Sequence, residues 1–138
     1  MENMLQTSDF VGVTFWIISV SMVASTFFFF SEANNVGKHW GTSVRVAGLI
    51  TLIAAVHYYY MRDVWVASGE TPTVLRYIDW LLTVPLQMIE FYLILAAVGA
   101  ATAGMFWRLL IGTLVMLVAG FLGEAGFINA TIGFIVGM

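Results

Sequence analysis

The sequence predicts an all-α membrane protein of antiparallel transmembrane helices, four of them complete, with the start of a fifth. Of its 138 residues, 61% are hydrophobic and only 9% are charged, and the mean hydropathy is +0.95. These values exclude an ordinary soluble domain. The apolar residues fall into runs of about 20, the length that crosses the hydrocarbon core as a helix. Short polar segments separate the runs, as expected for a multi-pass bundle.

The runs place spans at residues 10–30, 41–61, 74–98 and 106–122, with a partial span at 127–138. We expect one transmembrane domain with loops at 31–40 and 62–73, where Asn, Gly and Pro are typical of turns. A small-residue connection (99–104) and a Gly-Glu-Ala-Gly turn (123–126) join the later spans. Glu124 in that turn is expected to be a solvated loop acid. The last run is shorter than the about 20 residues a span needs, so we expect this sequence to be a fragment.

The composition excludes several classes of function. The five basic residues are Lys38, Arg45, Arg62, Arg76 and Arg108. They form no patch that would bind nucleic acid. The chain has no cysteine, and its two histidines, His39 and His57, are too far apart to indicate a metal site. There is no nucleophile–base pair or nucleotide-binding loop, so we expect neither an enzyme nor a metal protein.

Ionisable residues inside the third predicted span mark the candidate functional site. Asp79 and Glu90 are eleven residues apart, so on a helix they face within about 20° of each other and are separated by roughly 16 Å along the axis. Arg76, Thr83 and Gln87 lie on or near the same face. Ionisable groups in a spanning helix indicate function by default, because the protein must pair or hydrate them. The pattern predicts a proton path with a gap in the middle for another group.

Pro85 lies between the two acids. A proline in a helix removes one backbone hydrogen bond, and spanning helices tolerate this when nearby groups satisfy the freed carbonyl. We expect the Thr83 hydroxyl to contribute to that.

The run RYIDWLLTVPLQMIEFYLILAA (76–97) resembles the third helix of the proteorhodopsins, retinal-binding light-driven proton pumps of the microbial rhodopsin family. FWIISVSMVASTFFFF, HYYYMRDVW and LLIGTLVMLVAGFLGEAG resemble other parts of the same fold. The resemblance begins at Phe10 and implies a seven-helix bundle, with the rest of the fifth helix and the sixth and seventh helices outside this sequence. It implies all-trans retinal as cofactor, bound as a Schiff base to a lysine of the seventh helix. Lys38 is the only lysine here, and we expect it in a loop, where it cannot take that role.

The resemblance also implies roles for the ionisable residues. Asp79 would be the counter-ion and proton acceptor, and Arg76, one turn away, would help to hold it ionised. His57 would bond Asp79 and tune its pKa, since an imidazole changes charge near neutrality. Glu90 would be the proton donor, because apolar surroundings favour the neutral form of a carboxyl group.

By the same resemblance, the residues that face retinal are Trp80, Thr83, Gln87, Met116 and Gly120. The Gln87 amide resembles the blue-absorbing type. Trp16 would contact a histidine of the adjacent protomer in a homo-oligomeric ring, a pentamer or a hexamer. Without the resemblance, Trp16 is typical of an anchor at the membrane interface.

Basic residues predict the orientation. Lys38, Arg45 and Arg108 lie in or beside the first and third loops, whereas the second loop holds Arg62. Because cytoplasmic loops carry an excess of Lys and Arg, we expect these two loops in the cytoplasm and the N-terminus outside, in the inner membrane.

The sequence therefore predicts a light-driven outward proton pump whose partners are the lipid bilayer, retinal and protons. One alternative is a sensory photoreceptor of the same family. Such sensors commonly lack a carboxylate at the donor position, so Glu90 favours a pump. The other alternative is an unrelated small membrane protein whose polar residues join helices by hydrogen bonds.

Overall fold

The computed structural model describes residues 4–138, and within this range all regular structure is helical. The helices are α1 (Phe10–Glu32), α2 (Lys38–Ser68), α3 (Thr73–Ala97), α4 (Ala103–Glu124) and α5 (Ala130–Gly137). The first four are long and apolar enough to cross a membrane. The predicted all-α class, with four spans and a shorter fifth helix, is confirmed.

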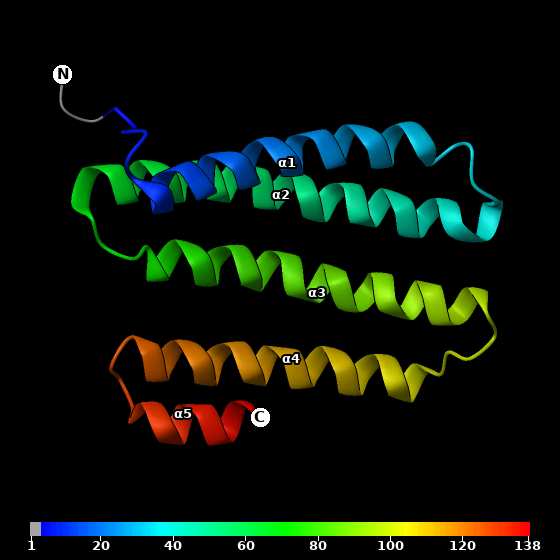
Figure 1. Cartoon of the computed structure of the whole chain (residues 1–138). Coiled ribbons are helices and arrows are strands. Elements are labelled where there is room, and N and C mark those ends of the chain that lie inside the picture. The colour runs from blue at the N-terminus through cyan, green and yellow to red at the C-terminus, as the bar shows by residue number, and fades with distance from the viewer. Residues whose placement is uncertain (1–3) are drawn as a thin grey trace.

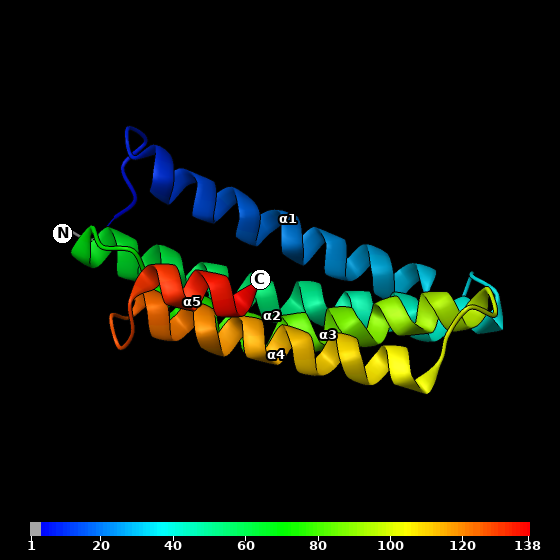
Figure 2. The ribbon, with the colours of Figure 1, turned by 90° about the horizontal axis from the view of Figure 1, so that it is seen from below.

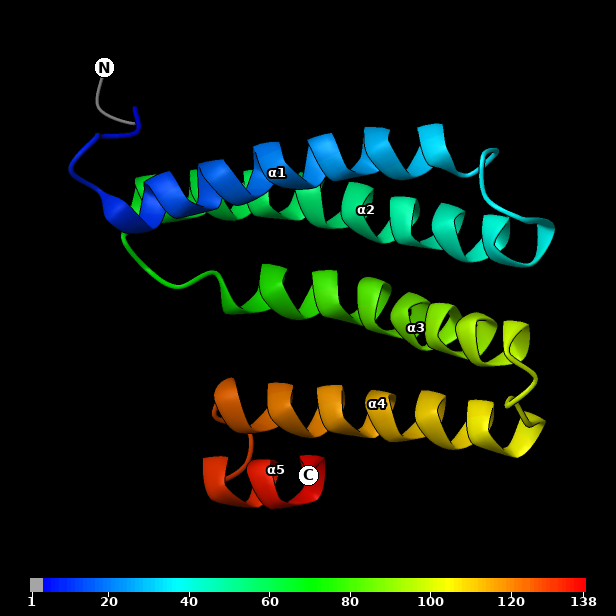
Figure 3. The same cartoon turned by 45° about the vertical axis from the view of Figure 1, so that its right-hand side comes forward.

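Consecutive helices run in opposite directions and lie side by side in chain order (Figure 1). Among the described residues, each helix packs only against its neighbours in the sequence. Seen from below, α1 is inclined to α2 (Figure 2), and α5 runs beside the C-terminal part of α4 (Figure 3). The starts of α1 and α3 and the ends of α2 and α4 therefore share one end of the bundle.

Helix α2 extends beyond the predicted second span in both directions. Its 31 residues measure about 46 Å, longer than the roughly 30 Å hydrocarbon core. The prediction that residues 38–40 and 62–68 lie in loops is wrong, because no glycine or proline interrupts the helix there. The helix ends at Gly69, whose φ of 68° is left-handed and whose amide donates to the carbonyl of Trp65. A glycine takes this conformation without steric cost.

Small and hydroxyl-bearing residues join α1 to α2. The hydroxyls of Thr26 and Thr51 are 2.9 Å apart and hydrogen-bonded. Gly48 lies against the ring of Phe30, where an added Cβ would be 3.1 Å from a ring carbon. Close approach at small residues and hydrogen bonds between hydroxyls are the usual means of packing helices in lipid.

A polar contact also fastens the start of α1 to the end of α2. The Asp9 carboxylate caps α1 by accepting the Gly12 amide. Its other oxygen accepts the indole N–H of Trp65 at 2.8 Å. One side chain thus satisfies the helix start and fixes the register of the two helices.

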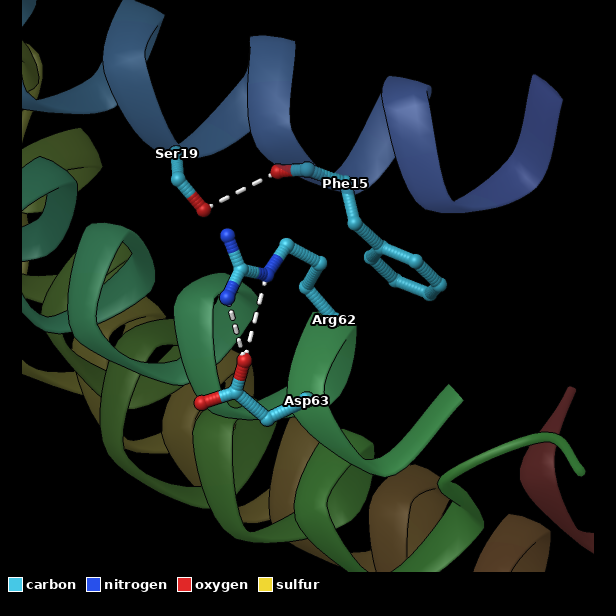
Figure 4. Close-up of polar contacts among 4 residues, drawn as sticks. All are labelled: Phe15, Ser19, Arg62 and Asp63. Carbon is cyan, nitrogen blue, oxygen red and sulfur yellow. Dashed lines mark hydrogen bonds and ion pairs between the residues drawn. The ribbon is translucent and has the colours of Figure 1, made fainter. Parts of the chain in front are cut away.

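Arg62 lies at the same end of the bundle, with its guanidinium directed toward Ser19 on α1 (Figure 4). It donates from Nε and Nη2 to Asp63 and lies 4.7 Å from the ring centroid of Tyr59. The Ser19 hydroxyl donates to the Phe15 carbonyl instead. The charge of Arg62 is therefore paired within α2.

Candidate functional site

Asp79, on the second turn of α3, is only 2% exposed. Its Oδ1 lies 3.5 Å from Nδ1 of His57 on α2, yet it has no hydrogen-bond partner among the described residues. Buried polar atoms are nearly always paired, and leaving one unpaired costs about 1–3 kcal/mol. Asp79 therefore offers a free acceptor position that suits a proton or a cationic N–H donor.

His57 places its Nδ1 beside Asp79 without hydrogen-bonding to it. Its Nδ1 lies 2.9 Å from the backbone carbonyl oxygen of Ile53, and because a carbonyl can only accept, Nδ1 carries a hydrogen. The structure thus brings together the two residues that the resemblance pairs.

A hollow of about 310 Å³ opens beside Asp79 between α1, α2 and α3. It is lined by Met22, Ile50, Thr51, Ala54, Tyr58, Asp79, Trp80, Thr83, Val84 and Gln87. Three of the predicted retinal-facing residues, Trp80, Thr83 and Gln87, are therefore in one wall. Nothing in the sequence singles out Tyr58, which only the packing of α2 on α3 brings to the hollow. Half of the lining residues are apolar and half carry a polar group, and a combination of apolar walls with placed polar groups is typical of small-molecule sites.

The Thr83 hydroxyl donates to the backbone carbonyl of Asp79 at 2.9 Å. The prediction that it helps to satisfy the carbonyl freed by Pro85 is therefore wrong, since that carbonyl belongs to Leu81. A threonine hydroxyl in a helix reaches the carbonyl three or four residues earlier, which excludes Leu81. Helix α3 continues through Pro85, and Thr83 supports the turn that carries Asp79.

Arg76 is turned toward α4 rather than toward Asp79. Its Nη2 forms an ion pair with Oε1 of Glu124, and the Thr73 hydroxyl donates to the same oxygen at 3.3 Å. Its guanidinium carbon lies 5.5 Å from the ring centroid of Trp80. Glu124 is exposed, as predicted, but its predicted place in a loop is wrong: it is the last residue of α4 and joins α4 to the start of α3.

Glu90 lies about 16 Å along α3 from Asp79 and is half-buried. It does not line the hollow. Gln87, between the two acids, is exposed at the edge of the hollow. The axial order of the predicted path is thus retained, with Asp79 buried and Glu90 more open.

Three other predicted residues lie away from the hollow. Gly120 on α4 faces Tyr77, whose hydroxyl would be 3.0 Å from an added Cβ. The side chain of Met116 is 41% exposed. Trp16, 48% exposed, lines a separate apolar groove between α1 and α2 with residues such as Tyr60. The roles that the resemblance gives these residues stay predictions.

Residues 9–138 match the family model described as bacteriorhodopsin-like protein. The chain belongs to this family. The blue-light absorbing proteorhodopsin of Gamma-proteobacterium Hot 75m4 is 58% identical over 134 residues. The green-light absorbing proteorhodopsin of Gamma-proteobacterium EBAC31A08 is 54% identical over 133 residues. These matches take in 97% and 96% of this chain and 53% of each relative, so the chain spans about half the length of the curated relatives it matches.

Solved structures of the family agree with the fold. The crystal structure of blue light-absorbing proteorhodopsin from Med12 matches with a TM-score of 0.85 at 57% identity, over 94% of this chain and 62% of that one. The Exiguobacterium sibiricum rhodopsin matches with a TM-score of 0.78 at 33% identity, over 91% of this chain and 58% of that one. The predicted microbial rhodopsin fold is confirmed.

Proposed function

We propose that the protein containing this chain is a light-driven outward proton pump that binds all-trans retinal and absorbs blue light. The observation that carries the proposal is the buried, unpaired Oδ1 of Asp79 at the wall of the hollow. A cationic group of the cofactor would satisfy this oxygen, and the apolar walls would hold a hydrocarbon. The higher identity to the blue-light absorbing relative, 58% against 54%, and the Gln87 amide support the blue-absorbing type.

Retinal, when bound, supplies the visible absorption and a light-driven change in proton affinity. Trp80, Thr83 and Gln87 would hold it from the wall of the hollow. Met116 and Gly120 on α4 lie away from this hollow, and their contact with retinal rests on the resemblance alone. The chain's single lysine, Lys38, begins α2, about 28 Å along the helix from the level of His57. The lysine that attaches retinal is therefore a different one.

In this proposal Asp79 receives the proton at Oδ1. The imidazole of His57, whose Nδ1 is 3.5 Å away, stabilises the carboxylate electrostatically before transfer. Glu90, half-buried on the same helix, supplies the next proton from the opposite side of the hollow. A carboxyl group at this position supports a pump over a sensor, which would need no fast reprotonation.

We place the protein in the inner membrane with the start of α1 outside. The α1–α2 and α3–α4 connections share one end of the bundle (Figure 1). The first two turns of α2 and α4, at that end, hold Lys38, Arg45 and Arg108, whereas Arg62 and Arg76 lie toward the end of α2 and the start of α3. The larger number of basic residues supports a cytoplasmic position for the first end. The exposure of Trp16 on α1 leaves it free to contact an adjacent protomer in a pentameric or hexameric ring.

A chimera tests the proposal. It joins residues 1–138 to the part of the blue-light absorbing relative that follows the matched region, and that relative alone is the positive control. Illuminated cells that express the chimera should acidify the medium, and a protonophore should abolish the effect. A chimera with a visible retinal band and no light-driven acidification would contradict pumping and favour the sensor. A membrane-inserted chimera with no visible band would contradict retinal binding.

A further inference from the structure

Arg76 and Asp79 are one helical turn apart on α3 but are held by different neighbours. Arg76 pairs with Glu124 at the end of α4, whereas Asp79 faces His57 on α2. Opposite charges at positions i and i+3 of a helix ordinarily attract each other. Here the two flanking helices keep this pair apart.

Arg76 and Asp79 each have one buried side-chain atom that makes no hydrogen bond among the described residues. Within residues 4–138, the buried side-chain polar atoms without a hydrogen-bond partner are Nε of Arg76 and Oδ1 of Asp79. One is a donor and the other an acceptor, so each could satisfy the other if the Arg76 side chain turned toward α2. What opposes this turn is the ion pair with Glu124, whose carboxylate is itself anchored by the Thr73 hydroxyl.

We propose that Glu124 is a positioning residue for the proton acceptor. By holding the Arg76 guanidinium on the α4 side, it keeps Asp79 unpaired and able to take up a proton. A carboxylate joined directly to a guanidinium is strongly favoured in its anionic form and would be a poor acceptor. The inference rests on the proposed function only for the acceptor role of Asp79.

The other groups around these residues do not replace Glu124. From α2, His57 and Tyr58 face Asp79. On α3, Trp80 packs against Arg76, and the Tyr77 hydroxyl lies beside Glu124. Among the described residues, the ion pair recorded for Arg76 is the one with Glu124. Removing this carboxylate therefore leaves Asp79 as the nearest acid along α3.

The test follows proton binding by Asp79 in the dark, in the chimera described above. A carboxylate beside a cationic chromophore changes the absorption when it is protonated, so visible spectra against pH report its titration. The Asp79→Asn variant identifies the transition by its loss. At about 0.15 M salt, where surface charges are screened, Glu124→Gln should move the midpoint about one pH unit or more toward lower pH. Glu70→Gln removes an exposed acid near the same end of the bundle and should leave the midpoint unchanged.

A double variant separates positioning from a simple effect of charge. If Glu124 acts through Arg76, Glu124→Gln should add no further shift in an Arg76→Gln background. The same shift in both backgrounds, or no shift in either, would overturn the proposal.

If Glu124→Gln yields no pigment, Glu124→Asp is titrated in its place. The shorter side chain of aspartate weakens the ion pair with Arg76 and should give a smaller shift of the midpoint in the same direction. An unchanged midpoint in that variant would also overturn the proposal. The titration reads proton binding and not transport, so a chimera that fails to pump leaves this result interpretable.

Discussion

Nδ1 of His57 on α2 lies 3.5 Å from Oδ1 of Asp79 on α3, and the same Nδ1 donates to the carbonyl of Ile53. The bond to the Ile53 carbonyl fixes the ring beside the buried acid. The pair thus joins an ionisable imidazole to an acid that is only 2% exposed. We expect the charge of the imidazole to control when Asp79 holds a proton.

Replacing His57 by asparagine should move the acid-induced colour transition of the chimera toward higher pH. The variant keeps an N–H donor but removes the positive charge that favours the anion of Asp79. Visible spectra recorded against pH measure the shift, and His39→Asn, an exposed histidine near the start of α2, is the matched control. Equal midpoints in the parent chimera and the His57→Asn variant would show that the contact has no electrostatic role.

Replacing Glu90 by glutamine should chiefly slow the return to the dark state, because the residue is expected to resupply the proton and not to accept it. Flash-induced absorption changes measure this return, and added azide, a small diffusible proton carrier, should restore its speed. If Glu90→Gln and Asp79→Asn gave the same photocycle, the assignment of donor and acceptor would be refuted.

Replacing Gln87 by leucine should shift the visible absorption of the chimera to longer wavelength. Gln87 lies at the edge of the hollow, where removal of the amide dipole changes the field on the cofactor. The green-light absorbing relative, at 54% identity, gives a reference spectrum. Gln6→Leu, at a residue outside the hollow, is the control, and a spectrum that does not change in Gln87→Leu would place the amide outside the field of the cofactor.

The packing of α5 on α4 depends on Gly133. An added Cβ there would be 2.8 Å from the backbone oxygen of Ala119 and 3.1 Å from Cα of Gly123. Because backbone atoms cannot move aside cheaply, Gly133→Ala should destabilise the fold by about 1–3 kcal/mol. Gly112→Ala is the matched control, since its Cβ meets nothing within 4 Å and alanine should stabilise the helix by about 0.5–1 kcal/mol. Unfolding followed by helical circular dichroism in detergent compares the two, and equal stability would contradict the close α4–α5 contact.

The positions of the helices could be predicted from the sequence, but most side-chain contacts between the helices could not. Hydropathy places the four spans because apolar runs of this length have one stable form in a bilayer. The end of α2 was misplaced because residues 62–68 contain charges typical of a loop, whereas the helix needs Gly69 to stop it.

The hydrogen-bond partners of Glu124 and Thr83 could not be predicted from the spacing of residues along the chain. Glu124 is flanked by glycine and alanine, as in a turn, and its partner Arg76 is 48 residues away. The Thr83 hydroxyl follows the local helix geometry and bonds the Asp79 carbonyl. By contrast, the pairing of His57 with Asp79 was expected because the resemblance carried the register of α2 on α3.

Whether Asp79 accepts the proton can be read from the infrared difference spectrum of the illuminated chimera. If Asp79 accepts the proton, a carbonyl band of a protonated carboxyl group should appear as the deprotonated form of the chromophore forms, persist in Glu90→Gln and be absent from Asp79→Asn. A band that survives unchanged in Asp79→Asn would place the transferred proton on another group and rule out Asp79 as the acceptor.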